Sequence, residues 1–268
     1  MSQAAIVNPA KQKLAAGEFV LCMTLRHVIT PDAPLMVREA GFDAFYVDRE
    51  HSAISESATS QLCISAVALG MTPLVRVRSL CSADIAGALD GGALGVIVPH
   101  VGTPEQARFA VQCAKFPPLG DRSVAALNPI TGYRSLPLPE TMRLQNDATL
   151  LIAMLETEEG IRNAEQIAAV PGIDILMIGS NDLSAQLGIA GEKNHPRLMD
   201  AFKTVAAAAL RHDKHFVGGG AGPDLAQVAG LGARVLMGGT DAAYFISGAR
   251  QSAQAIRAAL PSNIRKQE

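Results

Sequence analysis

The stretch TLLIAMLETEEGIRNAEQIAAVPGIDILMIGSND, residues 149–182, decides the fold. It begins with an apolar run that ends at Glu156, continues through an amphipathic segment, and closes with a second apolar run just before Asp182. Runs that are hydrophobic at nearly every residue are typical of parallel strands, because such strands are covered on both faces. The stretch therefore predicts a strand, a helix and a second strand parallel to the first.

The same alternation extends in both directions along the 268 residues. Amphipathic segments such as PEQARFAVQCAKF (104–116) separate apolar runs throughout and predict helices. The pattern predicts one (β/α)8 TIM barrel domain over residues 1–268, although an open doubly wound sheet shares much of it. A Pro- and Gly-rich segment, 116–140, is expected to be a long functional loop. The predicted strands are FVLCMTL (19–25), AFYVD (44–48), PLVRV (73–77), GVIVP (95–99), TLLIAMLE (149–156), DILMIGS (174–180), HFVGG (215–219) and RVLMGG (234–239).

Composition narrows the class of partner. The chain is 49% hydrophobic and 18% charged, and its formal net charge of −2 argues against nucleic acid or an anionic membrane as a partner. No run approaches the roughly 20 apolar residues of a membrane span, and the first residues lack a signal-peptide core. The four cysteines, Cys22, Cys63, Cys81 and Cys113, lack a CxxC spacing and have apolar neighbours, which predicts reduced packing residues in a cytoplasmic protein. Small molecules and copies of the chain itself are the expected partners.

Glu156 and Asp182 lie at or just beyond the ends of neighbouring predicted strands. In a TIM barrel the carboxyl ends of the strands form the face that carries the chemistry. Two carboxylates at one rim repel each other unless a cation neutralises them, and Mg²⁺ or Mn²⁺ typically binds only one or two protein carboxylates. Acids at the starts of two helices would look the same in sequence. The residues alone therefore leave a metal site and this structural role both open.

The second and third predicted strands also end in charged residues. Asp48, Glu50 and His51 follow one another at the end of AFYVD, and an acid beside a histidine can form an orienting pair for proton transfer. A simply exposed or hydrogen-bonded histidine is the structural alternative. In LVRVRS, Arg76 and Arg78 alternate onto one face, and an inward arginine needs an anion. That anion is either a substrate or a buried partner such as Asp48 or Glu50.

These residues together show that the chain resembles the HpcH/HpaI aldolases, which are metal-dependent class II pyruvate aldolases. The resemblance covers nearly the whole chain and implies aldol cleavage of a 4-hydroxy-2-oxo acid to pyruvate, or a close 2-oxo acid, and an aldehyde. It also implies a divalent metal, Mg²⁺, Mn²⁺ or Co²⁺, that stabilises the enolate. The matching segments are GFDAFYVDREHS (41–52), PLVRV (73–77), PPLGDRS (117–123), MLETEEGIRNAEQIAAVPGIDILMIGSNDLSAQLG (154–188) and GARVLMGGTD (232–241).

The resemblance assigns roles by position. Glu156 and Asp182 match the metal ligands of the family. His51 matches the general base that takes the 4-hydroxyl proton, and Asp48 matches the residue that orients this base. Arg76 matches the residue that holds the keto oxygen and stabilises the enolate.

The resemblance also implies contacts to the substrate and between subunits. The backbone at Gly179, Ser180 and Asn181 is similar to the turn that receives the pyruvate carboxylate, and Arg122 matches a substrate-binding arginine in the family's long loop. Family members assemble as trimers or as hexamers paired through a swapped C-terminal helix. The segment QSAQAIRAALPSNIRK (251–266) is the candidate for that helix, so a homo-oligomer is expected.

The chain departs from the family pattern near the substrate. Met154 stands where the family often has a glutamine that helps to bind substrate, and Ser180 replaces a proline. These departures leave the metal ligands and the base in place and concern substrate preference.

Three other readings remain open at this point. No predicted strand contains a lysine, which favours metal-based over Schiff-base stabilisation of the enolate. A decarboxylase of the oxaloacetate type or an acyl-CoA lyase would need the same metal-held enolate, so both remain alternatives to an aldolase. The glycine-rich segments VGGGAG (217–222) and MGGT (237–240) could cradle a phosphate, although no lysine or arginine adjoins them. A barrel that binds a keto acid without catalysis is the reading from another class of function.

Overall fold

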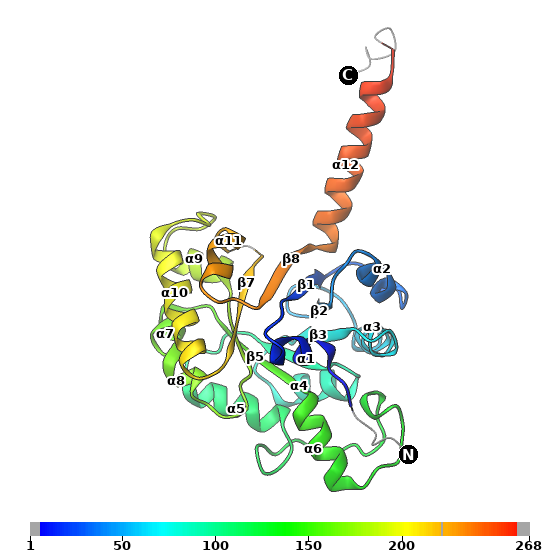
Figure 1. Ribbon diagram of the computed structural model, residues 1–268, viewed down its shortest axis with the longest axis vertical. Helices are drawn as coiled ribbons and strands as arrows, with labels where there is room; N and C mark the ends of the chain where they lie inside the picture. Colours follow the sequence, from blue (N-terminus) through cyan, green and yellow to red (C-terminus); the bar gives the residue numbers. More distant parts are fainter. Residues whose placement is uncertain (1–5, 221, 262–268) are drawn as a thin grey trace.

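Eight parallel strands close into a barrel in chain order in the computed structural model, which describes residues 6–220 and 222–261 (Figure 1). β8 pairs with β1, so the predicted TIM barrel is confirmed and the open-sheet alternative is wrong. Each strand agrees with its predicted range to within two residues at either end. That residues 1–268 are a single domain stays a prediction. The strands are β1 (Val20–Leu25), β2 (Ala44–Asp48), β3 (Thr72–Arg76), β4 (Gly95–Val98), β5 (Leu150–Leu155), β6 (Ile175–Ile178), β7 (His215–Gly219) and β8 (Val235–Thr240).

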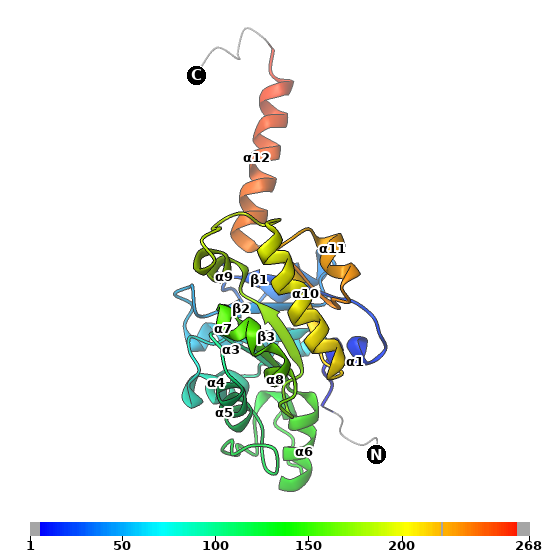
Figure 2. The ribbon, with the colours of Figure 1, turned by 90° about the vertical axis from the view of Figure 1, so that its left-hand side faces the viewer.

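Most helices surround the barrel, α1 packs Ala10 and Leu14 onto the interior cluster at one end, and α12 extends away from the barrel (Figures 1 and 2). In the part of the chain that the structure describes, no helix has the length and hydropathy needed to cross a membrane. The helices are α1 (Pro9–Ala15), α2 (Ala33–Glu39), α3 (Glu56–Ala68), α4 (Ser82–Asp90), α5 (Pro104–Ala114), α6 (Leu138–Ala148), α7 (Glu158–Arg162), α8 (Ala164–Ala168), α9 (Ser180–Gln186), α10 (Pro196–Arg211), α11 (Leu225–Gly230) and α12 (Asp241–Ala259), with a 3-10 turn η1 (Pro129–Thr131).

Two expectations about the connections are corrected. The long loop expected over 116–140 contains η1 and the beginning of α6, because a proline inside the first turn of a helix leaves its hydrogen bonds intact.

Cys81 is exposed at the N-cap of α4, whereas the other three cysteines are buried as predicted. Residues 262–266 of the candidate C-terminal helix, and Ala221 in the glycine-rich segment, lie outside the described residues.

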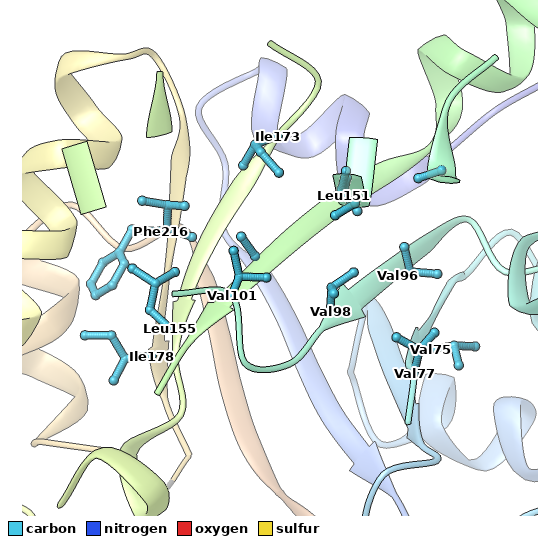
Figure 3. Packing of buried hydrophobic residues seen from close by; sticks show 14 of the residues in the cluster. Val75, Val77, Val96, Val98, Val101, Leu151, Leu155, Ile173, Ile178 and Phe216 are labelled. Carbon is cyan, nitrogen blue, oxygen red and sulfur yellow. The ribbon is translucent and has the colours of Figure 1, made fainter. Parts of the chain in front are cut away.

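Alternation along β5 decides which side chains face the interior of the barrel. Leu150, Ile152 and Met154 belong to the inner apolar cluster, whereas Leu151 and Leu155 pack outward against the helical layer (Figure 3). Successive side chains of a strand point to opposite faces, so residue 156 continues the inner row. Tyr46 of β2 and Leu74 of β3 also belong to the inner cluster. Asp48 and Arg76 lie two residues after them, so their side chains point to the interior as well. The strands thus direct three charged side chains toward the barrel axis at its carboxyl end.

The opposite end of the barrel is sealed around Asn8, just before α1. Its amide nitrogen donates to the carbonyl oxygens of Leu94 (3.0 Å) and Ala148 (2.7 Å). Its amide oxygen accepts from the hydroxyl of Thr72 at 2.9 Å. Asn8 is 3% exposed, so these bonds satisfy buried backbone groups that lie just before β4 and at the end of α6, far apart in sequence.

Replacing Asn8 with alanine is expected to lower the free energy of unfolding by about 1–3 kcal/mol, because it leaves buried carbonyl groups unsatisfied. Urea denaturation followed by circular dichroism measures the change. Asn194→Ala, at an exposed loop position, is the control and is expected to stay within about 0.5 kcal/mol of the wild type. Equal stability of the two variants would contradict the role of Asn8.

Candidate active site

A pocket of about 380 Å³ opens at the end of the barrel where the strands finish. Its wall includes His51 and Arg76 as well as the turn Gly179–Asp182, which the sequence also singled out. These residues lie far apart in the chain, and closure of the barrel brings them to one rim. This is the face on which TIM barrels carry their chemistry.

Arg76 and Asp48 form a buried bidentate ion pair beside the pocket. Arg76 Nε lies 2.9 Å from Asp48 Oδ1, and Arg76 Nη2 lies 2.6 Å from Asp48 Oδ2. A second arginine, Arg26, places its Nε 2.6 Å from Asp48 Oδ2. Burial opposes the charged form of Asp48, but the hydrogen bonds and charge of Arg76, with the backbone N–H of His51 and the charge of Arg26, outweigh it and hold the pKa of Asp48 below its ordinary value.

Of the two arginines that alternate on the third strand, Arg76 is buried and Arg78 is exposed. The sequence left open whether Arg76 meets a substrate or a buried acidic side chain. The buried acidic partners are present, since Arg76 contacts both Asp48 and Glu50. Arg76 Nη1 lies 2.9 Å from Glu50 Oε2. Arg76 nonetheless lines the pocket, so the ion pair and a substrate contact are compatible.

His51 lies at the mouth of the pocket with an exposed ring. Its backbone N–H donates to Asp48 Oδ1 at 3.2 Å, and its ring Nε2 lies 4.0 Å from Glu50 Oε2. Asp48 therefore holds the main chain of His51, and its carboxylate oxygens are directed to arginines and to this N–H. Asp48 was expected to orient the imidazole of His51, but it contacts the main chain of His51 instead. The reason is that both oxygens of the Asp48 carboxylate are already bound by Arg76.

Glu156 is buried at the end of β5 and its two oxygens have different surroundings. Oε2 accepts from the backbone N–H of His100 at 3.0 Å, whereas Oε1 is buried without a hydrogen-bond partner among the described residues. A Cβ atom added at Gly179 would lie 2.2 Å from Oε1, so Glu156 reaches across a site that only glycine leaves open. Burial, followed by the negative charges of Glu50 and Asp182, raises the pKa of Glu156 against the opposing effect of His100.

The acidic pair fits a divalent cation by the chemistry of its donors. Asp182 is exposed in the first turn of α9 and lies near enough to raise the pKa of Glu156. Within residues 6–220 and 222–261, no three His, Cys, Asp or Glu side chains gather as a metal site. Mg²⁺ and Mn²⁺ commonly bind through one or two carboxylates and complete their coordination with water and substrate oxygens. A buried carboxylate oxygen without a partner, beside a second carboxylate, is the donor set for such an ion.

The substrate-binding turn predicted at Gly179, Ser180 and Asn181 lies in the wall of the pocket. Gly179 is the N-cap of α9, and Ser180 and Asn181 begin that helix without a side-chain cap. Met154, which replaces the family glutamine, also lines the pocket and places its sulfur 3.9 Å from Arg76 Nη1.

Arg122 is separate from this pocket within one chain. Its side chain is buried against Asp90, the last residue of α4, and its guanidinium lies over the ring of Phe116, 4.7 Å from the centroid. Helices of a (β/α)8 barrel run antiparallel to the strands, so this position is at the opposite end of the barrel. A contact between Arg122 and the substrate of its own chain is therefore wrong.

Sequence reasoning missed three groups at the rim, His100, Lys193 and Arg26. His100 follows β4 and places Nδ1 2.9 Å from Glu156 Oε2 and Nε2 3.0 Å from Glu50 Oε1. Lys193, in the connection between α9 and α10, lines the pocket together with Arg26. A polar residue directly after a predicted barrel strand was the available signal for His100, whereas Lys193 lies in a loop whose path the sequence did not indicate.

The glycine-rich segments also reach the pocket, since Gly219, Gly220, Gly238 and Gly239 line it. They contribute backbone and little side-chain volume, which leaves space at the ends of β7 and β8. Arg26, Arg76, Glu156 and Asp182 follow or end β1, β3, β5 and β6, and of these strands β1 and β6 are the neighbours of β8 and β7.

A barrel rim that joins a buried arginine to two acidic strand ends suits the stabilisation of an enolate, and the class it defines is the carbon–carbon lyases. The family model described as HpcH/HpaI aldolase/citrate lyase matches residues 30–246. The chain therefore belongs to the HpcH/HpaI aldolase/citrate lyase family, and the resemblance seen in the sequence is confirmed.

Individual relatives agree with this assignment. The chain is 38% identical over 209 residues to a 4-hydroxy-4-methyl-2-oxoglutarate aldolase of Hapsidospora irregularis, with 77% of each chain covered. It is 32% identical over 197 residues to a 4-hydroxy-2-oxo-heptane-1,7-dioate aldolase of Salmonella typhimurium, covering 73% of this chain and 74% of the relative. The crystal structure of an HpcH/HpaI aldolase from Desulfitobacterium hafniense is similar, with a TM-score of 0.88 and 31% identity, covering 94% of this chain and 97% of that one.

Asp48→Asn is expected to lower the free energy of unfolding by about 3–5 kcal/mol at neutral pH, because it leaves Arg76 buried without its counter-charge. The pKa of Asp48 is lowered in the folded state, so its stabilisation is present above the ordinary value of 3.8 and is lost as the pH falls through the lower folded value. The difference from wild type should therefore shrink below pH 3.8.

Denaturant unfolding at several pH values measures this effect, with Asp84→Asn, a half-buried aspartate that accepts a hydrogen bond from the hydroxyl of Ser79, as the control. A cost for Asp48→Asn that is independent of pH would show that shape, and not charge, is what the Asp48 side chain contributes.

Proposed function

We propose that the protein catalyses the reversible, metal-dependent aldol cleavage of a 4-hydroxy-2-oxo acid to pyruvate, or a close 2-oxo acid, and an aldehyde. The observation that carries the proposal is the buried, unpartnered Oε1 of Glu156 beside Asp182, at a rim that also presents Arg76. The family assignment adds the class of reaction, since its described members are aldolases and citrate lyases.

Glu156 and Asp182 would hold the metal, which is Mg²⁺ or Mn²⁺, with Co²⁺ as a further candidate, because hard oxygen donors suit these ions. When bound, the ion supplies a Lewis acid for the negative charge that develops on the 2-oxo group. Arg76 adds a permanent positive charge at the same place, and its pairing with Asp48 fixes the guanidinium before substrate arrives.

Proton transfer is assigned to His51 at the pocket mouth. In the cleavage direction His51 removes the proton of the 4-hydroxyl group, the C3–C4 bond breaks, and the electrons of that bond pass to C3 and the 2-oxo oxygen as an enolate. The aldehyde leaves, and a proton delivered to C3 completes the methyl group of pyruvate. Asp48 contributes by accepting a hydrogen bond from the backbone N–H of His51, which fixes the main chain that carries the imidazole.

The substrate carboxylate is assigned to the backbone turn of Gly179, Ser180 and Asn181, which lines the pocket where α9 begins. The N–H of Gly179 donates to the carbonyl oxygen of Leu155 at 3.0 Å, so the N–H groups of Ser180 and Asn181 are the ones proposed to receive the carboxylate. The protein is proposed to assemble as a homo-oligomer, a trimer or a hexamer. The exposed side chain of Phe245 on the projecting α12, 77% exposed, supports contact with another copy. A cytoplasmic site of action completes the proposal and is consistent with four free cysteines.

Pyruvate incubated in D₂O with the protein and Mg²⁺ or Mn²⁺ should exchange its methyl protons, and the NMR signal should persist when a chelator is present. His51→Ala and Glu156→Ala are expected to lower the exchange rate by about 100-fold or more, because each removes a group on which enolate formation depends. Glu158→Ala changes an exposed acid two residues away and is the matched control. Metal binding without exchange would contradict the aldolase and favour the non-catalytic keto-acid-binding barrel.

The bond that is broken needs a separate assay. An oxaloacetate-type decarboxylase would release CO₂ from oxaloacetate faster than the protein cleaves any 4-hydroxy-2-oxo acid, and an acyl-CoA lyase would require a thioester substrate. The crystal structure of the citrate synthase SbnG, which is similar with a TM-score of 0.83 and 28% identity over 92% of this chain and 96% of that one, makes the thioester assay worthwhile.

The half of the substrate that leaves as the carbonyl product is proposed to carry a second carboxylate, as in 4-hydroxy-4-methyl-2-oxoglutarate, the substrate named for relatives at 38% identity. Because C4 of that compound carries a methyl group and no hydrogen, this half leaves as a 2-oxo acid, where a substrate with a hydrogen on C4 would release an aldehyde. Lys193 and Arg26 support this, because they place two positive side chains in the pocket wall. Arg26 is tied to Asp48 through Nε, whereas the Lys193 ammonium forms no hydrogen bond or ion pair with another of the described residues.

Lys193→Met should raise the KM for a dicarboxylic 4-hydroxy-2-oxo acid about tenfold, the loss expected for one charge-assisted hydrogen bond. Cleavage of an analogue with an uncharged aldehyde half should change little. Lys203→Met, on the outer helix α10, is the control. An equal rise in KM for both substrates would assign Lys193 to the pyruvate half.

A further inference from the structure

His100 holds an unusual backbone conformation directly after β4. Its φ is +57°, in the left-handed region that side chains other than glycine seldom adopt, although asparagine, aspartate and histidine enter it more readily than most. Such a conformation persists where the surrounding contacts determine it, and it is concentrated at functional sites. The backbone N–H and both ring nitrogens of His100 contact acidic side chains of the rim, Glu50 and Glu156.

The backbone and ring of His100 bind the same oxygen of Glu156. The main-chain N–H donates to Oε2 at 3.0 Å, and ring Nδ1 lies 2.9 Å from that oxygen. The other ring nitrogen, Nε2, lies 3.0 Å from Oε1 of Glu50. His100 thus bridges two carboxylates that approach from β2 and β5, while its own ring is 60% exposed. An exposed ring held at both nitrogens contributes little to the apolar core, so its contacts require a different explanation.

These contacts distinguish the two oxygens of Glu156. His100 contacts Oε2 twice, whereas Oε1 is directed at Gly179 and has no hydrogen-bond partner in the part of the chain that the structure describes. A carboxylate that is free to rotate would present either oxygen. One that is anchored through Oε2 presents Oε1 alone.

Glu50 extends the connection to the other side of the rim. Its Oε2 lies 2.9 Å from Arg76 Nη1, and Arg76 in turn binds Asp48. The ring of His100 therefore links the acidic side of the rim to the buried arginine pair through contacts of 3.0 Å or less.

We infer that His100 is a positioning residue that anchors Glu156 through Oε2 and thereby presents Oε1 to the divalent cation. The inference rests on the proposed function, because it gives His100 a role only through a metal ligand. Residues that hold a metal ligand in place through hydrogen bonds typically contribute a factor of about 10–100 to metal affinity.

Substitutions at His100 can separate its two ring contacts. The side-chain amide nitrogen of asparagine lies where histidine places Nδ1, and asparagine also tolerates a positive φ. The longer glutamine side chain places its amide nitrogen nearer the position of Nε2. His100→Asn therefore retains a donor for Glu156, His100→Gln retains one for Glu50, and His100→Ala retains neither.

The test is the dissociation constant of Mn²⁺, measured by electron paramagnetic resonance of the free ion, for wild type and the three variants. His100→Ala and His100→Gln are expected to bind Mn²⁺ about tenfold more weakly, and His100→Asn to stay within about threefold of wild type. His212→Ala is the matched control, because His212 makes a 2.7 Å contact with Glu165 on the surface, away from the pocket. The melting temperature without metal shows that each variant is folded.

The outcomes separate the two proposals. If wild type binds Mn²⁺ and His100→Ala binds it equally well, the inference about His100 is overturned and the aldolase proposal stands. Equal weakening in the asparagine and glutamine variants would overturn the assignment to the Nδ1 contact. If wild type does not bind Mn²⁺ at all, both this inference and the metal-dependent function fall.

Discussion

The buried ion pair between Asp48 and Arg76 is the interaction on which the rest of the site depends. A guanidinium inside a barrel is costly without a counter-charge, and here the carboxylate satisfies it in two places, at 2.9 and 2.6 Å. The pair leaves one guanidinium nitrogen for Glu50, and Glu50 is joined through His100 to Glu156. A chain of contacts therefore passes along the rim from β2 to β5. It holds a positive group and an acidic group at fixed places before any ligand binds, which is the preorganisation that an enolate requires.

Much of this arrangement could be predicted from the sequence because it follows from periodicity. Nearly continuous apolar runs predict parallel strands, and alternation along a strand then decides which end residues face inward. Glu156 continues the inner row of Met154 just as Arg76 continues that of Leu74. The eight strands and the inward side of these charges were accordingly predictable, and so was the position of the Gly179 turn at the rim.

What could not be predicted depends on contacts between strands. The sequence places Asp48 beside His51 but cannot show that Arg76 occupies the carboxylate, so the expected contact with the imidazole became one with its main chain. The bridging role of His100 needs the spatial order of three strand ends. Arg122 is another case, since a matching motif gives a residue's place in the chain and not the end of the barrel that it reaches.

The most direct test of the account is whether a metal held by Glu156 and pyruvate occupy one site. Mn²⁺ bound to the protein should strongly enhance the NMR relaxation of the C1 and C2 carbons of ¹³C-labelled pyruvate, because paramagnetic relaxation falls off steeply with distance. We predict a large enhancement in wild type that Glu156→Ala abolishes and that an excess of unlabelled pyruvate suppresses. Mn²⁺ bound tightly with no enhancement at either carbon would place metal and substrate apart and would contradict the account.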